Sequence, residues 1–465
     1  MNATKGNLSQ PKKGHTYRQW FVAILANTTL MTYGLQAGWV SPMTKVLQSE
    51  DSPTGHALED SEISWIASIV CLAAVAGVPL YSYMTDKFGR KISVIAIAVF
   101  QAICWLIKFS SANTATLIAA RVCSGLAAGG CFIVIPIYVN EISQDDIRGL
   151  TGSLLMMCQN IGILTMYALG AYVEYFKVLW IVSWLPIMTI VLMLKAPESP
   201  AFLIKVGRTE EATLVLSWLR GVSEDDKTIQ NEVIVMNNDK LYFQDLPSIS
   251  FLSMFKNQAW RREILLMGAI MTVCSTNGCF TILTYANALL ASSGVTFSPE
   301  MQTLSFPAVM IVAALLSMSC VERLGRKPLL ALSLASMMCS MVGMGAIILV
   351  QHQGSTVLWW LPVVMMMLSV ASYAAGAGPV PYIMMSEMFN FQIRAQVLGF
   401  IVAYSWFVNF LQLLAYAPIS NAVGMHTTFF FFGAINCLGF CIALVLLPET
   451  KGKSVEEIEA KFRNK

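Results

Sequence analysis

Charged side chains are scarce in this chain of 465 residues. Asp, Glu, Lys and Arg together make up 12% of it, whereas 56% is hydrophobic. A soluble globular protein carries about 25% charged residues, so the shortfall argues against an ordinary soluble fold. The apolar residues also form long blocks with almost no charge, and blocks of about 18 residues or more predict helices that cross a membrane.

The sequence also lacks the side-chain groupings on which enzymes and metal proteins depend. Its four His residues, His15, His56, His352 and His426, are scattered in the tail and the outer loops, and no Gly-rich phosphate loop is present. All 11 Cys residues fall inside apolar blocks, which predicts buried thiols rather than disulfides or metal ligands. We therefore expect no enzyme activity, no cofactor, no metal site and no nucleic-acid partner, and transport driven by gradients.

The apolar blocks predict twelve membrane spans. They lie near 19–41, 62–84, 91–111, 114–139, 149–172, 177–195, 262–290, 302–321, 328–350, 357–383, 394–418 and 426–447. If both termini face the cytoplasm, the outer loops hold only Lys45, Lys108 and Lys177, and nearly all other Lys and Arg residues are cytoplasmic. This asymmetry follows the positive-inside rule. The sequence therefore predicts a multi-pass protein of the plasma membrane with both termini in the cytoplasm.

Three short phrases occur twice, in the same order. The pairs are DKFGRK (86–91) with ERLGRK (322–327), EISQDDIRG (141–149) with EMFNFQIRA (387–395), and PESP (197–200) with PETK (448–451). Their offsets are 236, 246 and 251 positions, and each pair follows the corresponding span of its own half. The pattern predicts a duplicated unit of six helices.

The repeated phrases combine a Gly, which permits a tight turn, with basic residues that anchor the turn at the cytoplasmic interface. Neighbouring acids predict ion pairs at the helix ends, including Glu141 with Arg148 and Glu387 with Arg394. We interpret the set as paired charge clusters that hold the cytoplasmic ends of the halves together; for any single residue, interface anchoring is the alternative. The candidate gating residues are Asp86, Arg90, Glu141, Arg148, Glu198, Glu322, Arg326, Glu387, Arg394 and Glu449.

The expected fold is an all-α membrane protein of twelve transmembrane helices in two six-helix halves, with a small cytoplasmic helical segment. The segments are a cytoplasmic tail (1–18), a first bundle (19–195), a cytoplasmic helical linker (196–260), a second bundle (261–447) and a cytoplasmic C-terminal helix (448–465). The cytoplasmic helices are interpreted either as latches that hold the halves in one state or as simple connectors.

Several motifs along the chain occur together in one known family. They are Arg121 with GLAAGG at 125–130, PIYVNEIS (136–143), IRG (147–149), PESPAFL (197–203), GRK at both turns, GPVPYIMMSEMF (378–389) and PETKGKS (448–454). With them the chain resembles the sugar porter family of the major facilitator superfamily, and within it the insect facilitated trehalose transporters. The resemblance implies the twelve-helix major facilitator fold, a central site between the halves and alternating access.

The resemblance also bears on proton coupling. In the family's proton symporters the first span carries an Asp that partners an Arg in the fourth span. Here the first span reads FVAILANTTLMTYGLQAGWVSP, with no carboxylate, and no acid at membrane depth in spans five, seven, ten or eleven replaces it. The sequence therefore predicts a uniporter, in which Arg121 is structural and is satisfied by backbone carbonyls.

The family's sugar-binding positions fall on unusual residues in this chain. The span-five Gln falls on Met156, the two span-seven Gln on Cys274 and Ser275, the later span-seven Asn on Phe280, the span-eight Asn on Met310, the span-ten Trp on Tyr382, and the span-eleven Asn-Trp pair on Ser405 and Trp406. Such a pocket disfavours a polyol, because each unpaired hydroxyl costs about 1–3 kcal/mol. Nearby amides such as Gln159 and Asn409 either rebuild the site or make helix–helix hydrogen bonds.

The candidate substrate-binding residues are Met156, Gln159, Ser275, Asn277, Phe280, Thr284, Tyr285, Tyr382, Ser405, Trp406 and Asn409. Pro379 and Pro381 follow Gly378 and are expected to break the hydrogen-bond ladder of span ten, where freed carbonyls line a cavity. Tyr382, just beyond them, is expected to face the substrate or form the inner gate.

These features favour a facilitative transporter of a sugar such as trehalose or a hexose, working as a monomer in the lipid bilayer by alternating access. One alternative keeps the fold but carries a less polar small metabolite. The other is a membrane sugar sensor that binds its ligand and does not transport it.

Overall fold

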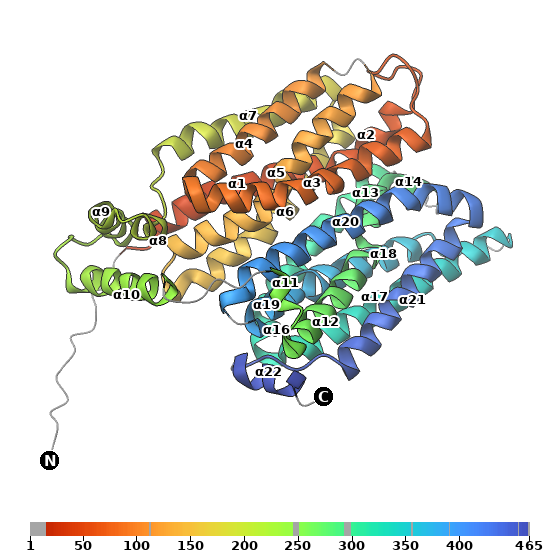
Figure 1. The fold of residues 1–465 in the computed structure, drawn as a ribbon. Coiled ribbons are helices and arrows are strands. Elements are labelled where there is room, and N and C mark those ends of the chain that lie inside the picture. The colour runs from red at the N-terminus through yellow and green to blue at the C-terminus, as the bar shows by residue number, and fades with distance from the viewer. Residues whose placement is uncertain are drawn as a thin grey trace.

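The structure is a computed structural model that describes residues 15–110, 113–244, 251–292, 299–354, 357–389, 391–453 and 455–463. Two helical bundles lie side by side, one from each half of the sequence (Figure 1). The short helices α8, α9, α10 and α22 lie at one end, here called the terminal end; α2 and α14 lie at the opposite, distal end (Figure 1).

The first bundle contains six long helices and one short one. They are α1 (Tyr17–Gly38), α2 (Val40–Leu47), α3 (Asp60–Phe88), α4 (Arg90–Phe109), α5 (Thr114–Ile142), α6 (Asp145–Tyr172) and α7 (Tyr175–Lys195). Four helices of the connecting segment follow: α8 (Pro200–Lys205), α9 (Thr209–Arg220), α10 (Lys227–Gln244) and α11 (Phe251–Met254).

The second bundle contains broken as well as continuous helices. Its elements are α12 (Gln258–Ser275), α13 (Cys279–Thr284), α14 (Ala286–Ser292), α15 (Pro299–Thr303), α16 (Ser305–Leu324), α17 (Arg326–His352), α18 (Leu361–Ser372), the π-helix η1 (Tyr373–Ala377), α19 (Pro379–Met388), α20 (Phe391–Val423) and α21 (Met425–Val445). The C-terminal helix is α22 (Val455–Arg463).

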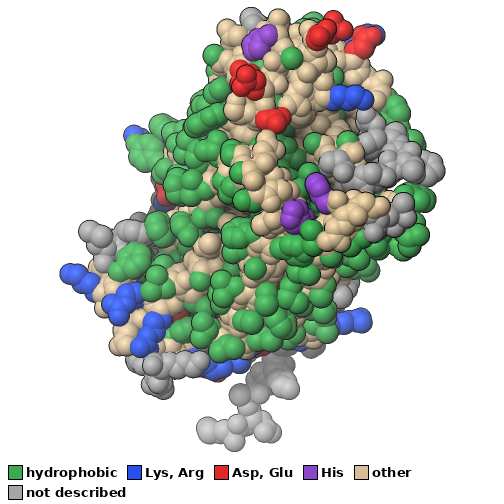
Figure 2. Space-filling view, turned by 90° about the vertical axis from the view of Figure 1, so that its right-hand side faces the viewer, with side chains coloured by type: hydrophobic (Ala, Val, Ile, Leu, Met, Phe, Trp, Pro, Cys, Tyr) green, Lys and Arg blue, Asp and Glu red, His purple; other side chains and the backbone are tan. Residues whose placement is uncertain are grey.

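Among the described residues, ten helical stretches are long and apolar enough to cross a membrane. The helices α1 and α16 complete the set of twelve; α1 is less apolar because it carries polar side chains such as Asn27 and Gln36, which are buried against other helices. On the face shown in Figure 2, the middle of the surface is mainly hydrophobic, most of the visible Asp and Glu lie at one end and most of the visible Lys and Arg at the other. The predicted all-α fold with twelve membrane helices is confirmed.

Glycines set the closest helix contact of the first bundle. A Cβ atom on Gly34 of α1 would lie 2.1 Å from the backbone oxygen of Gln159 on α6, and one on Gly162 would lie 2.1 Å from the backbone oxygen of Met31. Small residues allow membrane helices to approach this closely. The crossing therefore fixes α6, and with it Gln159, against α1.

The repeated GRK phrases form equivalent turns at the terminal end. Gly89 joins α3 to α4 with a φ angle of 98°, and Gly325 joins α16 to α17 with a φ angle of 92°. A Cβ atom at Gly89 would lie 2.3 Å from Oε2 of Glu198, and one at Gly325 would lie 2.8 Å from Oε2 of Glu449. Both positions require Gly, because the φ angles are positive, which residues with a Cβ atom rarely adopt, and because a carboxylate occupies the space that a Cβ atom would need.

A charge cluster surrounds the turn of the first half. The guanidinium of Arg90 donates to both carboxylate oxygens of Glu141, at 2.8 and 2.7 Å. The backbone N–H groups of Arg90 and Lys91 donate to Glu198 Oε1, at 2.9 and 3.0 Å. Arg148, the partner expected for Glu141, donates from Nη2 to the backbone oxygen of Ser143 at 3.4 Å.

The second half repeats this cluster. Arg326 donates from Nε to Glu387 Oε1 at 3.0 Å, and its backbone N–H donates to Glu449 Oε1 at 3.0 Å. Arg394, the partner expected for Glu387, donates to the backbone oxygen of Phe389 at 3.1 Å. Each cluster thus ties together helices of one half, which differs from the expectation that the clusters join the two halves.

The two remaining gating candidates lie apart from these clusters. Asp86 pairs with Lys205 of α8 at 2.8 Å, and both side chains are more than half exposed. A pair so exposed contributes little stability. The side chain of Glu322 lies outside the described residues, as do residues 1–14 of the predicted N-terminal tail.

Among the described residues, the hydrogen bonds that join the two halves all lie at the distal end. The backbone N–H and the side-chain amide of Asn287 donate to the hydroxyl and backbone oxygens of Ser41, both at 3.2 Å. The hydroxyl of Tyr167 donates to the backbone oxygen of Leu283. The structure is therefore a conformation in which the two halves meet at the distal end.

Candidate functional site

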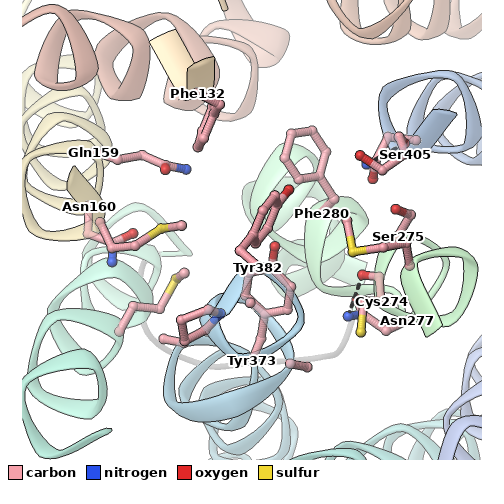
Figure 3. Close-up of a pocket in the computed structure, with 18 of the residues that line it drawn as sticks. Phe132, Gln159, Asn160, Cys274, Ser275, Asn277, Phe280, Tyr373, Tyr382 and Ser405 are labelled. Carbon is pink, nitrogen blue, oxygen red and sulfur yellow. Dashed lines mark hydrogen bonds between the residues drawn. The ribbon is translucent and has the colours of Figure 1, made fainter. Parts of the chain in front are cut away.

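A cavity of about 80 Å³ lies between the two bundles, and both contribute to its wall (Figure 3). The first half contributes side chains from α1, α5 and α6; the second contributes side chains from the broken helices α12–α13 and α18–η1–α19 and from α16 and α20. Broken helices at this depth are typical of a transporter site, because irregular backbone is tolerated where it lines a cavity.

Nine of the eleven candidate substrate-binding residues line this cavity. They are Met156, Gln159, Ser275, Asn277, Phe280, Tyr382, Ser405, Trp406 and Asn409, and Gly378 and Pro379 lie beside them. Thr284 and Tyr285 do not line it. Tyr285 stacks on Tyr416 with ring centroids 5.0 Å apart, because the chain turns at the end of α13 and carries both residues toward the distal end.

The cavity also contains residues that sequence reasoning missed. Tyr33, Phe132, Asn160 and Tyr373 all line it. Asn160 directly follows Gln159 in an otherwise apolar span, so its polarity was a usable signal. The three aromatic residues gave none, because aromatic side chains are common in every span.

Three aromatic rings pack against the ring of Trp406, and the four rings together connect the two halves. The ring centroid of Trp406 on α20 lies 6.2 Å from that of Tyr33, 5.8 Å from that of Phe132 and 6.5 Å from that of Phe280. Tyr33 and Phe132 come from the first half and Phe280 from the second. Edge-to-face contacts of this kind add about 0.5–1.5 kcal/mol each beyond burial, so the cluster forms a firm apolar boundary to the cavity.

Asn277 serves the backbone at the break in span seven. Its Nδ2 donates to the backbone oxygen of Cys274 at 2.7 Å, and its Oδ1 accepts from the backbone N–H of Cys279 at 2.9 Å. The next residue, Gly278, has a φ angle of 88°. The predicted continuous span is therefore divided into α12 and α13, and the amide of Asn277 satisfies the backbone groups that the break exposes.

Two further polar residues of the second half also bond within their own helix. Ser405 donates from Oγ to the backbone oxygen of Val402 at 2.8 Å, and Asn409 donates from Nδ2 to the backbone oxygen of Ser405 at 2.9 Å. In contrast, Oε1 of Gln159 is buried and has no hydrogen-bond partner. Figure 3 shows the Gln159 side chain reaching from α6 toward the space below Phe132.

Span ten is broken one turn before its prolines. The N–H of Gly378 donates to the backbone oxygen of Tyr373 at 2.8 Å. The two residues are five positions apart, which is the spacing of a π-helix. Ser333 of α17 satisfies the exposed backbone, because its Oγ donates to the Ser372 oxygen at 2.6 Å and accepts from the N–H of Ala377 at 2.9 Å. Pro379 then begins α19, where its missing N–H is tolerated.

Arg121 lies at membrane depth and is 3% exposed. Its Nε donates to the backbone oxygen of Ile66 at 3.0 Å and its Nη1 to the backbone oxygen of Gln36 at 2.6 Å. The side chain of Gln36 is engaged separately, since Oε1 accepts from Ser124 at 2.7 Å. Arg121 thus connects α1, α3 and α5 through backbone oxygens, and the neighbouring side chain on α1 is a neutral amide.

The sequence of this chain is similar to those of known transporters. The model of the sugar (and other) transporter family matches residues 22–462. The facilitated trehalose transporter Tret1 of Aedes aegypti is 28% identical over 448 residues, which are 96% of this chain and 55% of that protein. Tret1 of Polypedilum vanderplanki is 28% identical over 450 residues, which are 96% of this chain and 88% of that protein. The chain therefore spans about half the length of the Aedes relative.

Solved structures share the fold. An inward-open structure of the xylose transporter XylE from E. coli superposes with a TM-score of 0.78 at 19% identity, covering 95% of this chain and 99% of that one. A structure of the proton:xylose symporter XylE gives a TM-score of 0.77 at 19% identity, covering 96% and 99%. The family match runs through both bundles and the segment between them, and the chain belongs to the sugar (and other) transporter family.

Proposed function

We propose that the chain is a facilitative transporter that carries a sugar across the plasma membrane by alternating access. The observation that carries this proposal is the cavity between the two halves, lined from both and bounded by broken helices. A cavity at such an interface is reached from either face when the halves rock, because the fixed site lies between them. The insect relatives named as trehalose transporters support a sugar as cargo.

The charge distribution supports an orientation with both termini in the cytoplasm. On the face shown in Figure 2, most Lys and Arg side chains lie at the terminal end, which the positive-inside rule places on the cytoplasmic side. In this orientation the segments 1–18, 196–260 and 448–465 are cytoplasmic, and the halves meet on the outer side. The structure is then the state from which a solute leaves toward the cytoplasm, and one chain contains the whole cavity, which favours a functional monomer.

The surroundings of Arg121 support uniport rather than proton symport. Both side-chain hydrogen bonds of Arg121 go to backbone oxygens, and the neighbouring Gln36 cannot bind or release a proton in the physiological range. Proton coupling depends on an ionisable group that changes partner at membrane depth. Transport is therefore expected to follow the sugar gradient alone.

Uptake into proteoliposomes tests the proposal. Labelled D-glucose and trehalose should enter vesicles that contain the purified full chain, with saturation and without an imposed proton gradient. The Trp406→Ala variant should lose most of this uptake, since Trp406 borders the cavity. Trp184→Ala is the matched control, because Trp184 is 64% exposed on α7 and lies away from the cavity. Sugar binding without flux would select a sensor, and equal loss in both variants would contradict the site.

A further inference from the structure

The polar groups of the central cavity are not equally available to a solute. The Asn277 amide is engaged at both its nitrogen and its oxygen by backbone groups. The Ser405 hydroxyl and the Asn409 nitrogen each donate to a backbone oxygen of α20. These three side chains are therefore largely committed to the backbone of the second half, whereas Ser275, Tyr373 and Tyr382 are further polar side chains of that half that line the cavity.

The α6 wall differs in this respect. Oε1 of Gln159 is buried without a hydrogen-bond partner although it borders the cavity. Leaving a buried acceptor unpaired costs about 1–3 kcal/mol, and a solute hydroxyl that donates to it removes this cost. Asn160 lies next in the chain, is 3% exposed and also lines the cavity, so a second amide borders the same region.

The position of this wall is fixed by packing rather than by flexible side chains. The backbone oxygen of Gln159 lies against Gly34, where even one added carbon would approach it to 2.1 Å. Gly162, one turn later, packs equally closely against α1. Gln159 is thus presented from a rigid crossing, as a selective contact requires.

The remaining wall of the cavity is mainly apolar. Met271, Met310, Ala374 and Ala377 line it from the second half, together with the ring of Phe280. Phe280 and Tyr382 project into the space across from Gln159 (Figure 3). An apolar surface of this kind accepts the C–H face of a ring or a deoxygenated edge and leaves a hydroxyl unpaired.

We propose that the cavity selects a monosaccharide-sized ring with one hydroxylated edge, whose hydroxyl donates to Oε1 of Gln159, over a disaccharide or a fully hydroxylated ring. The proposal rests on the transport function proposed above and names the substrate class within it. Gln159 determines specificity because it is the buried acceptor that a solute satisfies. The apolar wall also determines specificity, because a sugar hydroxyl that faces Met310 or Phe280 loses its hydrogen bond to water and gains no other.

Competition for uptake measures this preference. Proteoliposomes with the full chain take up labelled D-glucose in the presence of trehalose or the 2-, 3- or 6-deoxy analogue of D-glucose. At least one deoxy analogue should compete about tenfold better than D-glucose, the factor expected when one unpaired hydroxyl is removed. Trehalose should compete least. Trehalose competing as well as D-glucose, or all deoxy analogues competing worse than D-glucose, would overturn the proposal.

Substitution of the amide tests the contact itself. Gln159→Leu should raise the KM for D-glucose about tenfold while kcat changes little, because the hydroxyl loses its acceptor. Gln159→Asn, which keeps an amide oxygen on a shorter side chain, should recover part of the affinity. Gln230→Leu is the matched control, since Gln230 is exposed on α10. An unchanged KM in Gln159→Leu would contradict the assignment.

Calorimetric titration of the purified protein separates this inference from the transport function. If no sugar crosses the membrane but the deoxy analogues still bind more tightly than trehalose, the selectivity stands and the transport function fails. If sugars cross but the order of affinities is reversed, the transport function stands and the selectivity fails.

Discussion

Arg121 donates a hydrogen bond to the backbone oxygen of Gln36 at 2.6 Å, so a buried cation on α5 is held by the main chain of α1. The side chain of Gln36 meanwhile accepts from Ser124 on the same helix as Arg121. Arg121 therefore supplies a fixed positive charge, and Gln36 supplies a neutral amide beside it. A carboxyl group at position 36 would lie near the guanidinium of Arg121.

The first prediction is that Gln36→Glu makes transport sensitive to pH. A carboxylate at this place competes for Arg121 with the backbone oxygens. It takes up a proton when it is neutralised and releases that proton when it ionises again, once in each cycle. Uptake by Gln36→Glu should rise as the pH is lowered, while the unmodified protein and Gln36→Asn keep a flat profile. Vesicle uptake across a series of buffers measures this. A steep pH dependence in the unmodified protein would contradict uniport.

The second prediction concerns the crossing of α1 and α6. Gly34→Ala should destabilise the fold by about 1–3 kcal/mol, because the added carbon would lie 2.1 Å from the backbone oxygen of Gln159 and overpacking forces the helices apart. It should also weaken sugar binding, since it displaces Gln159. Gly268→Ala is the control, as nothing lies within 4 Å of a carbon added there. Thermal unfolding in detergent compares them, and equal melting temperatures would refute the close contact.

The fold was readable from the sequence because it depends on composition and repetition. Long uncharged blocks follow from the absence of water in the bilayer core, and the two GRK turns recur because Gly89 and Gly325 share a positive φ angle and a facing carboxylate. The uncharged blocks and the Gly turns are local to a few neighbouring residues, whereas the facing carboxylates, Glu198 and Glu449, come from distant segments. The identity of the salt-bridge partners was not local, since Arg90 reaches Glu141 across 51 positions of the chain.

The site was readable only in part, because side-chain direction depends on where helices break. Nine candidates, found from motif spacing, line the cavity, whereas Thr284 and Tyr285, at the junction of α13 and α14, do not. Lys108 shows the same limit. Sequence reasoning placed it in an outer loop, but it is 0% exposed and lies 3.8 Å above the ring centroid of Trp39. A cation–π contact between distant segments leaves no mark in the local sequence.

The third prediction uses a repeated contact at the terminal end. Arg18 donates from Nη1 to the backbone oxygen of Trp218 on α9 at 2.8 Å, and Arg262 donates from Nη1 to that of Phe462 on α22, also at 2.8 Å. The residues that follow these Arg side chains, Gln19 and Glu263, are both buried. The nitrogen and the oxygen of the Gln19 amide both form hydrogen bonds, whereas Oε1 of Glu263 has no hydrogen-bond partner.

Glu263→Gln should therefore stabilise the protein by about 1–3 kcal/mol, because a neutral amide costs less to bury than an ionisable carboxyl group whose Oε1 has no partner. Gln19→Glu should destabilise it by a similar amount, since the new carboxylate cannot donate to the Leu219 oxygen. Melting temperatures in detergent provide the measurement. Opposite signs for the two exchanges are expected, and a loss of stability in Glu263→Gln would show that the carboxyl is satisfied in solution.

The fourth prediction concerns the pH dependence of stability. Burial raises the pKa of Glu198, although backbone N–H groups of Ser199, Lys91 and Arg90 oppose the change. Burial also acts to raise the pKa of Glu449, but there the backbone N–H groups around it prevail and the pKa lies below its ordinary value. The two equivalent carboxylates are therefore shifted in opposite directions.

The signs follow from the protonation of the folded state. The stabilisation by Glu449 is present above its ordinary pKa and is lost as the pH falls, so the difference in melting temperature between the unmodified protein and Glu449→Gln should shrink on acidification. Glu198 favours its protonated form, so its contribution is lost as the pH rises, and Glu198→Gln should be tolerated best at neutral pH. Melting curves at several pH values test both, and parallel profiles for the two variants would contradict the opposite shifts.

The last prediction tests alternating access directly. Ser41 and Asn287 lie in different halves and form two hydrogen bonds at the distal end, each of 3.2 Å, so this end must separate if the cavity is to open there. A Ser41→Cys, Asn287→Cys double variant should lose uptake when oxidised and regain it when the new disulfide is reduced. Each single variant should keep its uptake under both conditions, which controls for oxidation of the native cysteines. Full cross-linking with unchanged uptake would mean that the halves need not part at this end, and transport would have to follow another route.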